Sequence, residues 1–170
     1  MKTLDMSHYN DILPVEKLYR LAEEQHDNYR NARPHAHGVY DDVFTPSILQ
    51  NIVGEFDAKE EWKEYDTKYE KKLQLSKDDS LGPNTRALIH NLNSGSFLTF
   101  LEKLTGIESL IADPYLSGGG LHKIEPGGKL GIHTDFNRNN HLKLHRRINV
   151  LVYLNEDWEE SFGGHFELWS

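Results

Sequence analysis

The chain has 170 residues, of which 37% are hydrophobic, and it carries a formal net charge of -8 at pH 7. This length suits one domain with a substantial core and is short for two. The negative charge argues against general binding of nucleic acid or of an anionic membrane, because Lys and Arg make most contacts with phosphate.

The chain has no cysteine, which excludes disulfides and thiolate metal sites. No apolar run approaches the roughly 20 residues that a membrane-spanning helix needs. The first residues also lack the apolar core of a signal peptide. We therefore expect a cytoplasmic protein that acts on small molecules or proteins, with no membrane or nucleic-acid partner.

The first half of the chain predicts helices. Apolar residues at helical spacing after Pro14 predict a helix over residues 15–28. After an expected strand over 39–44, Thr45 can cap a helix that has Pro46 at its first position. The apolar residues that follow predict a helix with one face in the core (Ile48, Leu49, Ile52, Val53 and Phe56).

Residues 59–79 are mostly charged, with Trp62, Tyr65 and Tyr69 three and four residues apart. This spacing favours a helix whose aromatic stripe packs on the core, with a ligand-binding surface as the alternative. Further on, Asn93 or Ser94 can cap another helix, which Gly106 terminates.

The second half predicts strands. The expected strands cover residues 107–112, 121–125, 129–135, 147–155 and 164–169, and turns such as Glu125-Pro-Gly-Gly128 separate them. Helices followed by strands predict an α+β fold, in which a helical support packs on a β core.

The residues from Leu121 to Asp135 carry the clearest functional signal. They end in His133-Thr-Asp135, on what we expect to be the outgoing end of a strand. Side chains at i and i+2 of a strand point to one side, so the imidazole and the carboxylate can bind one metal ion. Such a pair supplies two members of the 2-His-1-carboxylate set that binds Fe(II).

The frame around this pair resembles the 2-oxoglutarate- and Fe(II)-dependent oxygenases of the prolyl 4-hydroxylase type. The strand Arg147-Ile-Asn-Val-Leu-Val-Tyr-Leu-Asn155 is followed by Asp157-Trp158, Gly163-Gly164 and His165-Phe-Glu-Leu-Trp169. Upstream, the stretch from Pro34 to Pro46 is similar to the start of bacterial and phage-like members. The resemblance covers residues 34–170 and is most specific near the C-terminal end.

The resemblance implies a double-stranded β-helix, or jelly roll, within a single domain over residues 1–170. Residues 1–110 would form a helical support with peripheral strands, and residues 111–170 the first half of the core. The implied activity is a dioxygenase reaction that couples conversion of 2-oxoglutarate to succinate with hydroxylation of a C–H bond. The implied cofactors are Fe(II), 2-oxoglutarate as cosubstrate, and ascorbate, and the partners are O2 and a peptidyl or small-molecule substrate.

The same resemblance assigns the site residues. His133 and Asp135 would bind the metal, and Tyr153 matches the family tyrosine that contacts 2-oxoglutarate. Strand alternation places Asn149 and Leu151 on the side of Tyr153, and makes Phe166 and Leu168 pocket lining. These assignments give the expected cosubstrate contacts (Tyr153, Asn149, Leu151 and Phe166).

The family completes its iron site with a second histidine and binds 2-oxoglutarate with an Arg or Lys, both downstream. His165 is the last histidine and falls on the face turned away from the pocket. We therefore expect this chain to be incomplete as an enzyme: a fragment, a partner of a missing C-terminal segment or second chain, or a degenerate remnant.

Two other classes of protein fit the same residues. One is a non-catalytic jelly-roll binding module, in which residues 118–135 form only a hairpin. The other is a different cupin-like metalloenzyme, whose metal would be held by His122, His133, Asp135 and His165. The histidines at 35, 37, 141 and 145 are read as peripheral or solvent-exposed.

Overall fold

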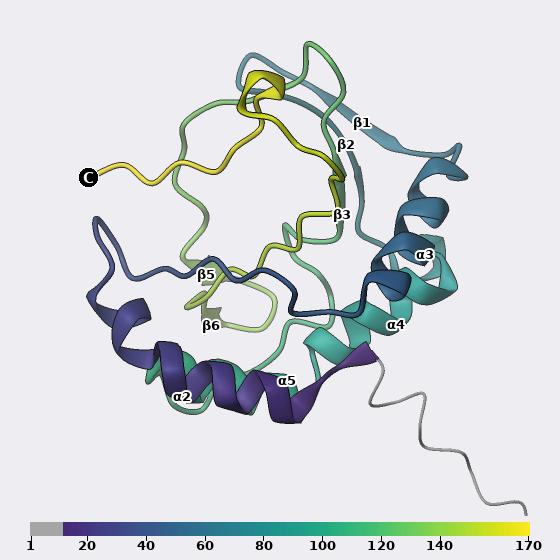
Figure 1. The fold of residues 1–170 in the computed structure, drawn as a ribbon. Coiled ribbons are helices and arrows are strands. Elements are labelled where there is room, and N and C mark those ends of the chain that lie inside the picture. Colours follow the sequence, from purple (N-terminus) through teal and green to yellow (C-terminus); the bar gives the residue numbers. More distant parts are fainter. Residues whose placement is uncertain (1–11) are drawn as a thin grey trace, which may run out of the picture. The chain divides into compact units, whose positions relative to one another are not determined.

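The computed structural model describes residues 12–170, and its contacts divide these residues into two compact units. The helical unit contains residues 12–58, 81–114 and 166–170, and the strand unit contains residues 59–80 and 115–165. Together they hold helices and small antiparallel sheets, consistent with the predicted α+β class (Figure 1). Within residues 12–170, no helix has both the length and the apolar character needed to cross a membrane.

Four helices make up the helical unit as described, namely α2 (Val15–Asn31), α3 (Pro46–Asp57), α4 (Pro83–Leu92) and α5 (Gly95–Thr105). Three of them confirm predicted helices. Ser94 caps α5 by accepting a hydrogen bond from the Phe97 amide at 3.4 Å, and Gly106 ends the helix in the left-handed conformation, at φ 73°. Helix α4 was not predicted, although Gly82-Pro83 places a proline at its first turn.

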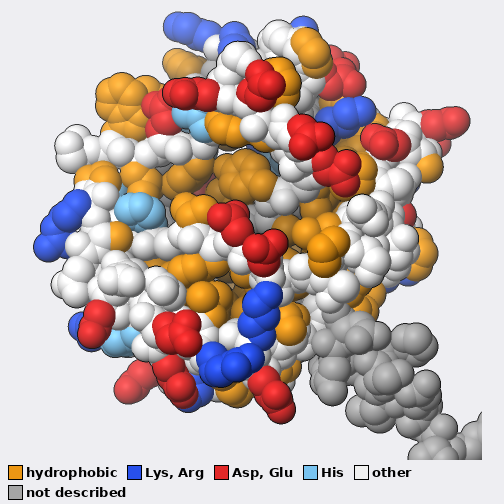
Figure 2. Space-filling model, viewed as in Figure 1, with side chains coloured by type: hydrophobic (Ala, Val, Ile, Leu, Met, Phe, Trp, Pro, Cys, Tyr) orange, Lys and Arg blue, Asp and Glu red, His pale blue; other side chains and the backbone are white. Residues whose placement is uncertain are grey.

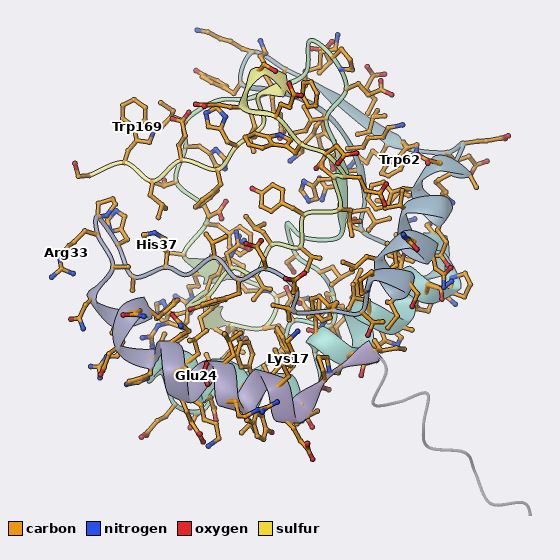
Figure 3. All side chains as sticks on the ribbon, in the orientation of Figure 1. Lys17, Glu24, Arg33, His37, Trp62 and Trp169 are labelled. Atoms are coloured by element: carbon orange, nitrogen blue, oxygen red, sulfur yellow. The ribbon has the colours of Figure 1, made fainter. Side chains whose placement is uncertain are left out.

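The core of the helical unit lies where α2 packs against α5, with α4 beside them. All ten buried hydrophobic residues of the described chain belong to this unit (Leu13, Leu18, Ala22, Ile52, Leu81, Leu88, Phe97, Phe100, Leu101 and Leu104). The opposite face of α2 carries Lys17 and Glu24, which Figure 3 labels, so this helix is amphipathic as its sequence pattern predicts.

The Glu55 carboxylate on α3 holds the start of α4. Its Oε1 accepts hydrogen bonds from the amide and the side chain of Asn84, both at 2.7 Å. Its Oε2 accepts from the amide of Thr85 at 2.8 Å and from the Thr85 hydroxyl at 2.6 Å. A side chain from one helix thus satisfies two free amides of another.

The strand unit contains a sheet in which β2 (Glu70–Leu75) is central. Strand β1 (Lys63–Asp66) pairs with one edge of β2, and β3 (Leu121–Lys123) and β4 (Lys129–Leu130) pair in succession with the other. All these pairs are antiparallel. A second small sheet joins β5 (Arg138–Asn139) to β6 (Leu144–His145).

The helix predicted over residues 59–79 is wrong, because these residues form the β1–β2 hairpin. Thr67 builds its tight turn: its amide donates to the Glu70 carbonyl at 2.8 Å, and its hydroxyl oxygen accepts from the Tyr69 and Glu70 amides. Pairing of β2 with β3 and β4, about 50 residues later in the chain, overrides the helical spacing of the aromatic residues.

Several other predicted strands do not form in the described part of the chain. Residues 39–44, 107–112, 147–155 and 164–169 form no strand, and the strand expected over 129–135 is limited to β4. In Figure 1 the described chain after β6 is accordingly drawn without a strand, and a short 3-10 turn, η2 (Glu160–Phe162), interrupts the coil. The fold therefore does not confirm a jelly-roll core.

Candidate metal centre

The chain reaches the candidate site through a tight turn after β3. The Gly128 amide donates to the Glu125 carbonyl at 2.7 Å, Pro126 takes the second position and Gly127 has a φ of 81°. These features match a type II turn, in which the third residue needs a positive φ. The turn predicted at Glu125-Pro-Gly-Gly128 is therefore confirmed, and it aligns β4 with the sheet.

His133 and Asp135 follow β4 directly. The Gly131 amide donates to the Tyr69 carbonyl at 2.8 Å, which is the last backbone hydrogen bond that the structure shows between this segment and the sheet. The pair therefore lies beyond strand β4. The sequence pattern had instead placed it within a strand, at its outgoing end. The two side chains still converge, with His133 Nε2 3.4 Å from Asp135 Oδ1.

A hydrogen bond to the backbone orients the imidazole of His133. Its Nδ1 lies 2.8 Å from the Gly131 carbonyl oxygen. Because a carbonyl oxygen only accepts, Nδ1 must donate its proton there. In the neutral ring Nε2 then carries a lone pair, and this lone pair faces a carboxylate oxygen of Asp135. In this neutral form two acceptors lie 3.4 Å apart, an arrangement that a bound cation would stabilise, whereas a protonated His133 ring forms an ion pair with Asp135.

The other oxygen of Asp135 has different partners. Its Oδ2 lies 3.2 Å from the Arg146 guanidinium and 3.3 Å from the side-chain amide of Asn149, which donates to it. Arg146 was not among the predicted site residues. The β5–β6 hairpin, which was not predicted, brings Arg146 back to Asp135.

The predicted cosubstrate contacts are placed less closely. Asn149 contacts Asp135, whereas the side chains of Leu151 and Tyr153 are 51% and 58% exposed. Phe166 is 59% exposed and belongs to the helical unit. Partial burial raises the pKa of the Tyr153 hydroxyl, so this group stays protonated at neutral pH and can donate a hydrogen bond.

The remaining histidines of the strand unit have other surroundings. His122 lies on β3 opposite Gln74, and burial, followed by the charge of Lys72, lowers its pKa. The ring of His141 packs edge-on against Tyr115, with ring centroids 4.5 Å apart, and that of His165 lies in the same manner 6.3 Å from Trp158.

His35 and His37, which were expected to be peripheral, lie in the helical unit. His35 Nε2 lies 3.1 Å from the carbonyl oxygen of Trp169, and His37 Nδ1 lies 2.8 Å from that of His35. Across residues 12–170, no group of three or more His, Asp or Glu side chains is arranged to hold a metal ion. The four-residue set of the cupin-like alternative is therefore not assembled.

Comparison with protein families places this site in context. Residues 119–170, which include His133, Asp135, Arg146 and Asn149, match the model of the 2OG-Fe(II) oxygenase superfamily. The match supports this superfamily for the C-terminal part of the chain. It does not distinguish a prolyl 4-hydroxylase type from other members. Comparisons with curated proteins and with solved structures give no match.

Proposed function

We propose that the protein is a 2-oxoglutarate- and Fe(II)-dependent dioxygenase that hydroxylates a C–H bond in a prolyl 4-hydroxylase-like reaction. The observation that carries the proposal is the opposed pair of His133 Nε2 and Asp135 Oδ1, 3.4 Å apart, within the segment that matches the oxygenase superfamily. Both side chains are about half exposed, so a metal ion and a small cosubstrate can reach them.

The residues fit an iron ion in chemistry and in spacing. Imidazole nitrogen and carboxylate oxygen are the ligand types of non-haem Fe(II) sites. Ligands bound about 2.1 Å from one metal at a right angle lie about 3 Å apart, close to the observed separation of 3.4 Å. The bond from His133 Nδ1 to the Gly131 carbonyl also fixes the tautomer, as backbone carbonyls do for metal-bound histidines.

When bound, iron and 2-oxoglutarate supply the oxidation of the substrate C–H bond. The chain's own residues bind and orient. His133 and Asp135 hold the metal, and the protonated hydroxyl of Tyr153 donates to a carboxylate of the cosubstrate. Leu151 provides an apolar contact in this proposal, and Asn149 contributes through Asp135. The contact expected from Phe166, which belongs to the helical unit, stays a prediction from the resemblance.

We also propose that residues 111–170 form the first half of a jelly-roll core, supported by residues 1–110 within one domain. Exposure along residues 147–155 agrees with the predicted faces in part. Ile148, Val152 and Leu154 are less exposed than Leu151 and Tyr153, whereas Val150 is 42% exposed and these residues form no strand.

Metal binding tests the proposal directly. Anaerobic calorimetry with Fe(II) should show weak binding by the wild-type chain, because the structure provides two protein ligands. His133→Ala and Asp135→Ala should each remove most of this binding. His165→Ala is the matched control and should leave it unchanged. Equal loss from His165→Ala would favour the cupin-like alternative, and no binding by the wild type would refute the iron site.

Cosubstrate turnover tests the reaction class. Because the described residues bring only His133 and Asp135 together as possible metal ligands, we expect this chain alone to release little succinate from 2-oxoglutarate. Any release should depend on Fe(II) and on Asp135. Proline-containing peptides that gain one oxygen atom would establish the prolyl 4-hydroxylase-like activity. Metal affinity no greater than that of ordinary surface histidines would instead point to the non-catalytic binding module.

A further inference from the structure

We propose that Arg146 and Asn149 are positioning residues for Asp135, which hold one of its carboxylate oxygens so that the other stays directed at His133. The inference rests on the proposed iron site and adds to it two residues that do not touch the metal. Asp135 Oδ2 lies 3.2 Å from Arg146 and 3.3 Å from Asn149, whereas Oδ1 is the oxygen that faces His133.

The three side chains close a triangle of polar contacts. The Arg146 guanidinium donates to Oδ1 of Asn149 at 2.9 Å, and Nδ2 of Asn149 donates to Asp135. The side-chain amide of Asn149 is thus held through both its oxygen and its nitrogen. Rotation of the carboxylate would break its contacts with both donors, so the triangle holds Asp135 in one orientation.

The β5–β6 hairpin explains how residues 11 positions apart meet. Arg138 pairs with His145, and Asn139 with Leu144. The Arg146 amide then donates to the Asn137 carbonyl at 2.9 Å, which extends the same antiparallel register by one step toward Asp135. The Asn139 side chain closes the loop by accepting hydrogen bonds from the His141 and Leu142 amides, both at 3.0 Å.

Arg146 is itself held in place. Its side chain is 20% exposed, and its guanidinium carbon lies 4.6 Å from the ring centroid of Phe136. Phe136 in turn packs on Gly118, where an added Cβ would lie 2.9 Å from the ring. A guanidinium stacked on an aromatic ring loses little further freedom when it binds a carboxylate. The position is therefore preorganised before a metal arrives.

This arrangement has a consequence for metal binding. With Oδ2 held by two donors, Asp135 presents a single oxygen, Oδ1, beside His133 Nε2. Removal of the donors lets the carboxylate rotate away from this orientation. Loss of such outer partners typically lowers metal affinity about 10- to 100-fold, and we expect an effect of this size here.

The experiment uses Mn(II), a redox-stable substitute for Fe(II), and measures its affinity by calorimetry and by the spin-resonance signal of free Mn(II). Arg146→Met and Asn149→Ala should each lower the affinity about 10- to 100-fold. Arg146→Lys keeps the charge with fewer donors and should recover part of the loss. The exposed neighbour Arg147 provides the matched control, Arg147→Met, which should bind like the wild type.

A double-mutant cycle separates positioning from general stabilisation. If Arg146 acts through Asp135, Arg146→Met should have no further effect on the residual affinity of Asp135→Ala. Wild-type affinity in both Arg146→Met and Asn149→Ala would overturn the inference while leaving the iron site intact. Absence of Mn(II) and Fe(II) binding by the wild type would overturn both. If Arg146→Met lowers the melting temperature of the metal-free protein, its affinity is no longer a clean test. The Mn(II) affinity of Asn149→Ala then decides: a loss supports the inference and wild-type affinity overturns it.

Discussion

The helical unit and the strand unit differ sharply in what they bury. Within residues 12–170, all ten buried hydrophobic residues lie in the helical unit. Of the fifteen large hydrophobic residues that are exposed in the described part of the chain, eleven lie in the strand unit (Tyr69, Tyr115, Ile124, Leu130, Ile132, Phe136, Val150, Leu151, Tyr153, Trp158 and Phe162). The candidate iron site thus lies in the unit without a buried apolar core of its own.

This difference reflects how each unit is held together. Helices satisfy their backbone hydrogen bonds locally, and the four helices need only pack their apolar faces. Strands need partners that are distant in the sequence, as β2 needs β3 and β4. We therefore expect the helical unit to dominate the stability of the protein, and the strand unit to open at lower free energy.

The largest effect on the free energy of unfolding is expected from a buried phenylalanine, compared here with an exposed one. Phe100 on α5 is 5% exposed and Phe162 in the strand unit is 67% exposed. Phe100→Ala should lower the free energy of unfolding by about 3–5 kcal/mol, because it leaves a cavity in the core. Phe162→Ala should change it by less than about 0.5 kcal/mol. Urea unfolding measures both, and equal losses would contradict the comparison.

The next effect concerns the strand unit. Gly120 has a φ of 104°, and an added Cβ would lie 2.1 Å from the Leu75 carbonyl oxygen. Gly120→Ala should therefore strain the β2–β3 pairing by about 1–3 kcal/mol. Hydrogen exchange should show faster exchange of the β2 and β3 amides with little change in α2 and α5. Gly119→Ala is the control, since its Cβ would meet nothing closer than 3.7 Å.

A smaller effect should depend on pH. Burial tends to raise the pKa of Glu55, but its hydrogen bonds from Thr85 and Asn84 outweigh this and lower it from 4.5. A lowered pKa means that the stabilisation is complete above about pH 4.5, and that it is lost as the pH falls through the folded-state value. Glu55→Gln should cost about 1–2 kcal/mol at pH 7, as loss of a helix cap does.

Thermal unfolding between pH 3 and pH 7 checks this prediction. The variant Glu55→Gln should lose part of the pH dependence of the melting temperature that the wild type shows. Glu24→Gln, on the exposed face of α2, should keep the wild-type profile. An unchanged profile for Glu55→Gln would show that the contact between α3 and α4 does not contribute to stability.

The sequence predicts the helical unit well because its signals are local. Pro46, Ser94 and Gly106 mark helix ends through their own backbone preferences. The β1–β2 hairpin was missed because Trp62, Tyr65 and Tyr69 fit a helical period, and only pairing with distant strands decides otherwise. The charged composition of residues 59–79 gave no indication of these partners.

The sequence identifies the local part of the candidate site, and the metal-binding role of that part stays a prediction. His133 and Asp135 are two residues apart, so their convergence follows from local geometry. Arg146 reaches Asp135 only through the register of β5 and β6, which the sequence pattern does not reveal. The roles of Tyr153, Leu151 and Phe166 remain predictions from the resemblance.

The smallest effect on stability should accompany a clear effect on association. Monomeric proteins rarely expose large apolar patches, yet hydrophobic side chains reach the surface in Figure 2, and most of the large exposed ones belong to the strand unit. We expect the chain to self-associate as its concentration rises.

Phe162→Ser should reduce light scattering and binding of a hydrophobic dye, while it changes the free energy of unfolding by less than about 0.5 kcal/mol. Val39→Ser replaces a single exposed hydrophobic residue of the helical unit, and it should leave light scattering and dye binding unchanged. A strictly monomeric wild type that binds no dye would show that the apolar side chains of the strand unit are covered in solution.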